Sequence, residues 1–161
     1  MRISLLIDSP LATLQQAMRG LDSAVKRQIG AQTKRVALPV WQEETRFRGD
    51  TRQRTRLAQS AAVGVTATNV TLKAGIGPLS RTASLTELAK AIEFGNNPYV
   101  KEQAVSKRGK VFTRRRGNRF GPPAKKGNVA YPAAAAATPR IIALWIQTAV
   151  RTIHEEIEKV G

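Results

Sequence analysis

A wide apolar stripe near the end of the chain limits the folds that this sequence can adopt. Thr138 and Pro139 match a helix N-cap and first-turn pair, and the alanine run at 133–137 favours a helix. Apolar residues then recur at three- and four-residue steps, the spacing of one helical face. The stripe comprises Ile142, Trp145, Ile146, Ala149, Ile153 and Ile157, broadened by Ile141, Leu144 and Val150. The sequence therefore predicts a long amphipathic C-terminal helix.

A second stripe predicts N-terminal helices. It starts after Ser9-Pro10 and comprises Leu11, Leu14, Met18, Leu21, Val25, Ile29, Val36 and Val40. We expect a break near Gly20–Asp22, because glycine weakens a helix. Pro39 is expected to kink or end the second helix, because it lacks an N–H and clashes with the preceding turn. The stripe is basic and would suit a membrane surface, but a core-facing helix needs the same pattern, and we favour the core.

The middle of the chain predicts a small sheet. Alternating apolar residues on either side of Thr68-Asn69 favour an antiparallel hairpin over residues 62–75. Residues 86–95 fit either a helix or a strand. The arginine-rich segment 45–56 has little to bury and is expected to be a solvated loop or charged arm. Sheet and amphipathic helices need one another to form a core, so we predict one α+β domain over 1–161.

Residues 101–126 hold ten basic residues and one acid, Glu102. Apart from a possible short strand at 111–113, we expect a long flexible loop or protruding basic arm, inserted over 97–130. Phe112 and Phe120 flank an arginine triplet and are suited to stack on bases. The arm would contact DNA without sequence preference, or an acidic neighbouring subunit. The candidate contacts are Lys107, Arg108, Lys110, Arg114, Arg115, Arg116, Arg119, Lys125 and Lys126.

The charge balance also indicates a polyanionic partner. The 27 Lys and Arg residues less the 11 Asp and Glu residues leave +16, a field that attracts nucleic acid or acidic proteins. No apolar stretch approaches the roughly 20 residues that a bilayer needs, and the apolar run within Met1–Ile7 is too short for a signal core. We expect no membrane association.

Catalysis finds little support in the sequence. The chain has no cysteine, which excludes disulfides, thiolate zinc sites and cysteine nucleophiles. The single histidine, His154, lies among glutamates that we interpret as a solvated helix face. Glu43 and Glu44 are adjacent and would point in different directions on a helix. No phosphate-binding loop or nucleophile elbow occurs. We expect no enzyme activity, cofactor, metal or small-molecule substrate.

The order of these parts carries a family resemblance. A basic helical half leads into a hairpin, then Glu93-Phe94-Gly95, a basic insertion, Pro132 and a terminal helix. This resembles the tail-completion or head–tail joining (minor tail, neck) protein family of long-tailed double-stranded DNA bacteriophages, over roughly residues 20–160. In that family a segment like Glu93-Phe94-Gly95 precedes a proline-containing approach to the last helix, and Pro132 stands in the matching place.

The resemblance implies an α+β subunit of a homo-oligomeric ring, six-fold like the tail, that contacts neighbouring neck or tail proteins of the virion. DNA passes through such a ring, which would give the basic arm a channel to line or an acidic ring to grip. The alternative is a nonspecific nucleic-acid-binding protein, associated with ribosomes or nucleoid. A second alternative is an inhibitor-like protein that binds one acidic partner.

Overall fold

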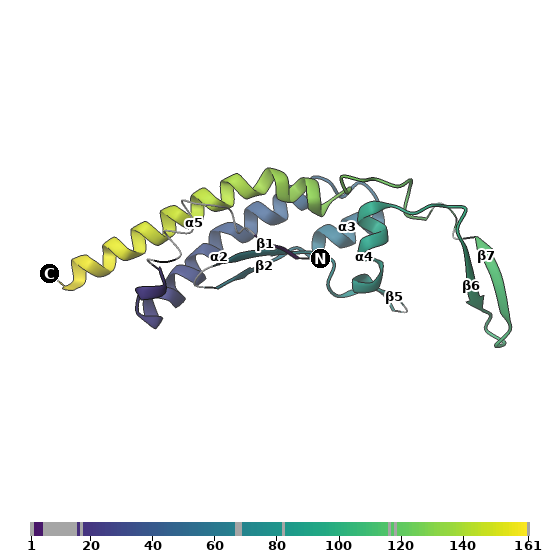
Figure 1. The fold of residues 1–161 in the computed structure, drawn as a ribbon, viewed down its shortest axis with the longest axis horizontal. Helices are drawn as coiled ribbons and strands as arrows, with labels where there is room; N and C mark the ends of the chain where they lie inside the picture. Colours follow the sequence, from purple (N-terminus) through teal and green to yellow (C-terminus); the bar gives the residue numbers. More distant parts are fainter. Residues whose placement is uncertain are drawn as a thin grey trace.

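The computed structural model describes residues 2–4, 16, 18–66, 69–81, 83–115, 117 and 119–160. The fold is α+β, as predicted, and the molecule is elongated, with the end of the last helix and a two-stranded hairpin at opposite ends (Figure 1). In chain order, the elements are β1 (Arg2–Ser4), α2 (Ser23–Arg46), α3 (Arg52–Gln59), β2 (Ala62–Val65), β3 (Val70–Lys73), β4 (Pro78–Ser80), β5 (Ala83–Ser84), α4 (Leu85–Phe94), β6 (Lys101–Val105), β7 (Val111–Arg115) and α5 (Ala130–Val160).

Helix α2 is the centre of the molecule, because it packs on α5 along one side and on β2 along another. Its buried residues recur every four positions and are Ile29, Thr33, Ala37, Trp41 and Thr45. The predicted break at Gly20–Asp22 is confirmed, since the Asp22 carboxylate caps α2 by accepting the Ala24 N–H at 2.8 Å. Backbone hydrogen bonds from Ala24 and Ser23 lower the pKa of Asp22. Of the shorter preceding helix, residues 18–20 are helical and Met18 is buried, whereas Leu11 and Leu14 lie outside the described residues.

Pro39 was expected to kink or end this helix; an end at Pro39 is wrong, because α2 continues to Arg46. Proline removes one backbone hydrogen bond from a helix. Pro39 itself is exposed, while Ala37 and Trp41 on either side are buried. Packing on both sides of the proline outweighs the missing bond.

The main sheet has the order β1-β3-β2 and is antiparallel. The predicted hairpin is confirmed as β2 and β3, in which Val63 faces Leu72 and Val65 faces Val70. Residues 67 and 68, in the expected turn, lie outside the described residues. The pairing of β1 with β3 was not predicted, because three residues carry too little pattern. The Trp41 indole N–H of α2 donates to the Lys73 carbonyl at 3.0 Å and fastens the helix to the sheet.

The prediction of a solvated loop over residues 45–56 is wrong. Thr45 is fully buried in the last turn of α2, and Thr51 caps α3, which begins at Arg52. Two of its arginines form i,i+4 ion pairs, Arg48 with Glu44 and Arg54 with Asp50, each at 2.7 Å. Local ion pairs and caps hold this segment in helices, while Leu57 of α3 is buried.

The ambiguous segment at 86–95 is helical and forms α4, which packs against α3. Gly95 ends this helix with a φ of 70°. A turn follows, closed by the Val100 N–H donating to the Asn97 carbonyl at 3.3 Å.

Helix α5 begins at Ala130, so the prediction that Thr138 and Pro139 start it is wrong. The Thr138 hydroxyl donates to the Ala134 carbonyl at 2.6 Å inside the helix. The predicted stripe divides by exposure. Ile141, Trp145 and Ala149 are buried, and Ile146, Val150 and Ile157 are exposed. The remaining members, Ile142, Leu144 and Ile153, are half-buried. The predicted stripe covers more of the circumference of α5 than the contact with α2 can bury.

By length and composition, α5 is apolar enough to cross a membrane, contrary to the sequence expectation. A helix of a protein core passes the same criterion. Ile141, Trp145 and Ala149 of α5 are fully buried, and α5 packs along α2, so the criterion by itself does not favour a membrane span.

Candidate assembly surfaces and basic arm

The basic arm is a β-hairpin that projects from the core. Strands β6 and β7 pair in register from Lys101↔Arg115 to Val105↔Val111. Their main contacts are with each other, and the hairpin stands off at one end of the molecule (Figure 1). The predicted strand at 111–113 is confirmed and longer than expected, but the segment is folded and is not a structureless loop.

The tight turn of the arm carries three cations. Gly109, with a φ of 78°, allows the reversal, and the Ser106 N–H donates to the Lys110 carbonyl at 2.8 Å. Lys107, Arg108 and Lys110 are all exposed in this turn. The arm therefore presents concentrated positive charge at its far end.

The structure separates the predicted polyanion contacts into two groups. Lys107, Arg108, Lys110, Arg114 and Arg115 belong to the hairpin. The other described contacts, Arg119, Lys125 and Lys126, are exposed in the segment that returns to α5, and Arg116 lies outside the described residues.

Two aromatic residues of the arm differ in exposure. Phe112 on β7 is 43% exposed and is available to stack on a base. Phe120 is partly buried against the core. Of the two rings expected to stack on bases, Phe112 is therefore the more accessible one, and base stacking by either ring stays a prediction.

The charges within the hairpin are partly neutralised. The Arg114 guanidinium pairs with Glu102 on the neighbouring strand at 3.0 Å, directly across the ladder. Arg115 pairs in register with Lys101, so two cations lie opposite each other. Like charges at such positions repel, and an anion bound between them would relieve this repulsion.

Apolar side chains are also exposed on the arm. Val105 and Val111 face each other across the two strands next to the basic turn, and both are more than half exposed. An isolated two-stranded hairpin is marginally stable in water. This exposed pair was not predicted from the sequence. The pattern that could have indicated it is one valine on each side of the Lys107–Lys110 turn.

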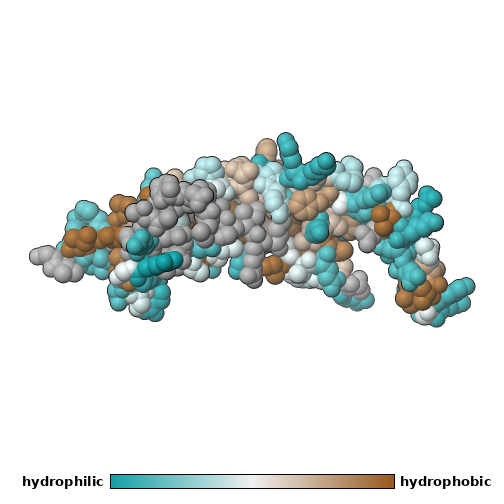
Figure 2. Space-filling view, in the orientation of Figure 1, coloured by the Kyte–Doolittle hydropathy of each residue, from teal (hydrophilic) through white to brown (hydrophobic). Residues whose placement is uncertain are grey.

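A second exposed apolar surface lies on α5. We define the α5 face as Ile146, Val150 and Ile157, which are 37%, 58% and 67% exposed. Each of Ile146 and Val150 follows a buried residue, so the face is rotated by about 100° from the side that packs on α2. Figure 2 shows hydrophobic surface near the C-terminal end of α5 and also at the far end of the hairpin.

Acidic residues flank the α5 face. Glu155, Glu156 and Glu158 lie in the last turns of the helix. Glu155 pairs with Arg151 at 2.7 Å, and Glu156 accepts a hydrogen bond from Lys159 at 2.6 Å, which raises the pKa of Lys159. His154 Nδ1 lies 3.4 Å from Glu158. Among the described residues, no cluster of three or more histidine, aspartate and glutamate side chains is arranged to hold a metal.

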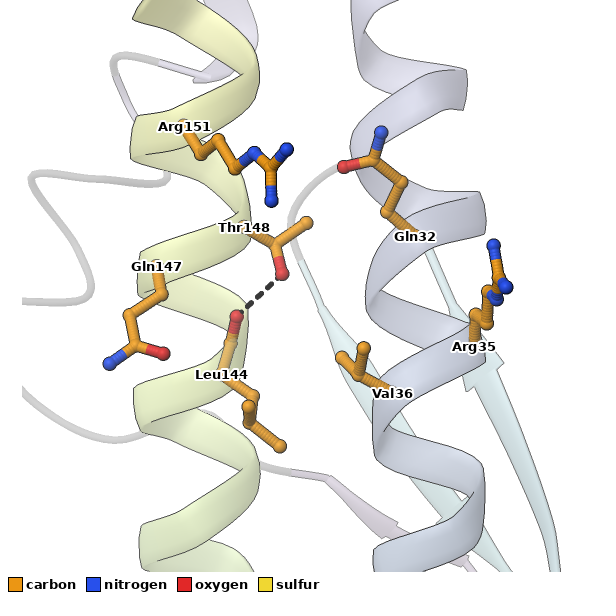
Figure 3. Close-up of a pocket in the computed structure, with 7 residues that line it drawn as sticks. All are labelled: Gln32, Arg35, Val36, Leu144, Gln147, Thr148 and Arg151. Atoms are coloured by element: carbon orange, nitrogen blue, oxygen red, sulfur yellow. Dashed lines mark hydrogen bonds between the residues drawn. The ribbon is translucent and has the colours of Figure 1, made fainter.

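A groove of about 480 Å³ lies between α2 and α5. In Figure 3, Val36, Leu144 and Thr148 lie between the helices, whereas Gln147 points outward. Thr148 donates to the Leu144 carbonyl at 2.7 Å, so its hydroxyl is already engaged. The groove is lined by Gln32, Arg35, Val36, Leu144, Gln147, Thr148 and Arg151. These seven side chains form no convergent set of catalytic groups (Figure 3).

The family-motif residues form a structural junction. Glu93 is fully buried, and its carboxylate accepts the N–H groups of Val129, Ala130 and Tyr131 at 3.1, 2.9 and 2.9 Å. These N–H groups belong to the start of α5, where a helix carries unpaired donors and partial positive charge. Phe94 packs on Tyr131, with ring centroids 5.1 Å apart.

Two further motif residues shape this junction. A Cβ at Gly95 would overlap the Pro122 carbonyl oxygen, and Pro132 lies in the first turn of α5, where proline is tolerated. Of the four residues that carried the resemblance, Glu93 therefore has a capping role, and Phe94 and Gly95 have packing roles.

Glu43 and Glu44 also have a structural role. Arg140 of α5 lies 3.6 Å from Glu43 and 3.2 Å from Glu44, and so ties α5 to the end of α2. Comparisons with protein-family models, with curated proteins and with solved structures find no match to this chain.

Proposed function

We propose that the protein is a structural, non-catalytic component of a tailed bacteriophage particle, at or near the head–tail joint, that completes or joins the tail by ring assembly. The projecting hairpin carries this proposal. It is basic, exposes Val105 and Val111, and makes its main contacts within itself. Such an element gains stability only when it meets a partner.

The charge distribution supports a place around a DNA channel. Lys107, Arg108 and Lys110 lie at the far end of a hairpin that stands clear of the core. Cations held there would reach a phosphate backbone or the acidic face of a neighbouring ring, without a requirement for base readout. The order of elements, with Glu93-Phe94-Gly95 before the basic insertion, supports the phage assignment by resemblance.

The test is a density-gradient fractionation of lysate from the producing cells, with mass spectrometry for this chain and electron microscopy of the peak. Co-migration with tailed particles at a fixed low copy number, near six or twelve for a ring, is the expected result. Sedimentation with ribosomes or nucleoid, with no particles carrying the chain, would overturn the proposal.

The second candidate function is nonspecific nucleic-acid binding, which the exposed Phe112 beside Arg114 favours. Both functions predict salt-sensitive DNA binding, so that assay does not separate them. Native mass spectrometry of the purified protein without DNA separates the two functions, because it shows whether the protein forms an oligomer by itself. A closed oligomer of defined subunit number supports the ring, and a monomer that associates only on DNA supports the alternative.

A further inference from the structure

We propose that the hairpin of one copy docks on the α5 face of the next copy. This inference rests on the ring assembly proposed above and identifies the two surfaces that meet. One surface is the hairpin tip, which we define as Val105, Val111 and the intervening basic turn. The other is the α5 face with the glutamates at 155–158.

Both surfaces expose apolar side chains that lack cover in the described part of the chain. Val105 and Val111 are 68% and 57% exposed, and Val150 and Ile157 of the α5 face are 58% and 67% exposed. Neighbouring apolar groups of this kind mark interaction sites. One contact between hairpin tip and α5 face would remove both sets from water.

The charges of the two surfaces are complementary. The hairpin from Lys101 to Arg115 has six basic residues and one acid, a balance of 6 − 1 = +5. Three of the chain's eleven acidic residues fall within 155–158. Two of these carboxylates already pair within α5, Glu155 with Arg151 and Glu156 with Lys159. Docking would add the cations of the basic turn to this network, an arrangement that steers association and sets its register.

The positions of the two surfaces exclude a contact within one chain. The hairpin and the end of α5 lie at opposite ends of the elongated molecule (Figure 1). The contact is therefore between copies and heterologous, which produces a ring when the rotation between subunits closes. Pairing of two α5 faces would instead leave Val105 and Val111 uncovered and would bring no carboxylates to the cations of the basic turn.

The natural absence of cysteine allows a direct test by disulfide mapping. Single Val111→Cys and Val150→Cys variants are purified, mixed in equal amounts and oxidised. Because a disulfide needs Cα atoms about 6 Å apart, the proposal predicts a Val111→Cys to Val150→Cys dimer on mixing and far less dimer in either variant alone. Disulfide formation only within the Val150→Cys sample would indicate paired α5 faces and would overturn the proposal, as would no dimer in any sample.

The matched control is Ile76→Cys. Ile76 is an apolar residue outside both surfaces and is 54% exposed, close to Val111. Mixed with Val150→Cys, it should give only background dimer. An equal yield from both mixtures would mean random collision and would also overturn the proposal.

A second variant keeps the test independent of cysteine chemistry. Val150→Arg would set a cation against the basic hairpin tip and should weaken self-association at least about tenfold. Phe47→Arg, at a residue 87% exposed on the α2–α3 turn, should leave it unchanged. If native mass spectrometry finds the same number of subunits in wild type and in Val150→Arg, the proposed contact is contradicted.

The outcomes separate this inference from the phage assignment. A chain that co-migrates with particles but gives no mixed disulfide keeps the proposed function and rules out docking of the hairpin on α5. A mixed disulfide in a chain that never enters particles keeps the docking and rules out the assignment.

Discussion

The Glu93 carboxylate of α4 accepts the Ala130 backbone N–H of α5 at 2.9 Å, across 37 residues of sequence. One buried side chain thus begins the longest helix of the protein from another element. The basic hairpin leaves and returns between these two residues. The junction therefore holds the base of the arm as well as the start of α5.

Glu93→Ala should lower the free energy of unfolding by about 3 kcal/mol, because three N–H groups at the start of α5 lose a charged acceptor. Urea unfolding followed by circular dichroism measures the loss. Glu87→Ala, at an exposed residue in the first turn of α4, should change stability by less than about 0.5 kcal/mol. Equal effects of the two substitutions would contradict a capping role for Glu93.

Gly95→Ala should destabilise the protein more than its backbone conformation alone requires. Gly95 and Gly117 have almost the same φ, 70° and 69°, but a Cβ meets Pro122 at Gly95 and has no heavy atom within 4 Å at Gly117. Gly117→Ala should cost about 1 kcal/mol for the left-handed backbone, and Gly95→Ala about 3 kcal/mol once overlap is included. Thermal unfolding of both variants compares the costs, and similar melting temperatures would show that the Pro122 contact relaxes freely.

Trp145→Ala should cost about 3–5 kcal/mol, because it removes a large side chain from the core. Trp145 is 1% exposed, whereas Ile157 on the same helix is 67% exposed. Ile157→Ala should therefore leave monomer stability within about 0.5 kcal/mol of wild type. Denaturant unfolding at low protein concentration measures both variants. A loss below about 1 kcal/mol for Trp145→Ala would mean that its site repacks.

Replacing Arg114, Arg115 and Arg116 with Ala should weaken polyanion binding and its dependence on salt. The slope of the logarithm of the binding constant against the logarithm of the salt concentration should fall by roughly one unit for each phosphate that the variant no longer neutralises. Fluorescence anisotropy with a DNA duplex at several salt concentrations measures the slope. Arg56→Ala, at an exposed residue of α3, serves as the control and should leave it unchanged. The melting temperature should change little in the triple variant and in the control, because the described arginines Arg114 and Arg115 lie outside the core. A triple variant with the wild-type slope would remove the hairpin from the binding site.

Limited trypsin digestion should cut the free protein first in the hairpin turn. Lys107, Arg108 and Lys110 are exposed there, and the hairpin makes few contacts with the rest of the chain. Assembly should slow this cleavage, because the proposed docking covers the turn. Peptide mass mapping over time identifies the first site. Resistance that is equal in the free and assembled protein would show that the hairpin is a packed element in both.

Elements with a long or regular pattern could be predicted from the sequence alone. The stripe predicted for α2 contained Ile29, which is buried, but also Val36, which is 36% exposed, so the helix was predicted while its buried face was placed one residue off, since Ala37 and Trp41 are buried instead. The alternation around Val63 and Val70 and the stripe around Trp145 also repeat with the period of their element. Periodicity is a local property, so these elements could be predicted before any contact was known. The basic arm was also evident, since a segment so rich in charge cannot enter a core.

Contacts between distant segments set where the helices begin, where they continue and which apolar residues stay exposed. Pro39 and Pro139 lie within helices because packing by Trp41, Trp145 and their neighbours outweighs a local helix-breaking signal. Glu93 caps α5 from 37 residues away, a distance that no local pattern records. Val150 is apolar like Ala149, yet only Ala149 is buried. The contact with α2 covers only one side of α5, so Ala149 is buried and Val150 is exposed. A second copy of the chain is proposed to cover the apolar surface that remains.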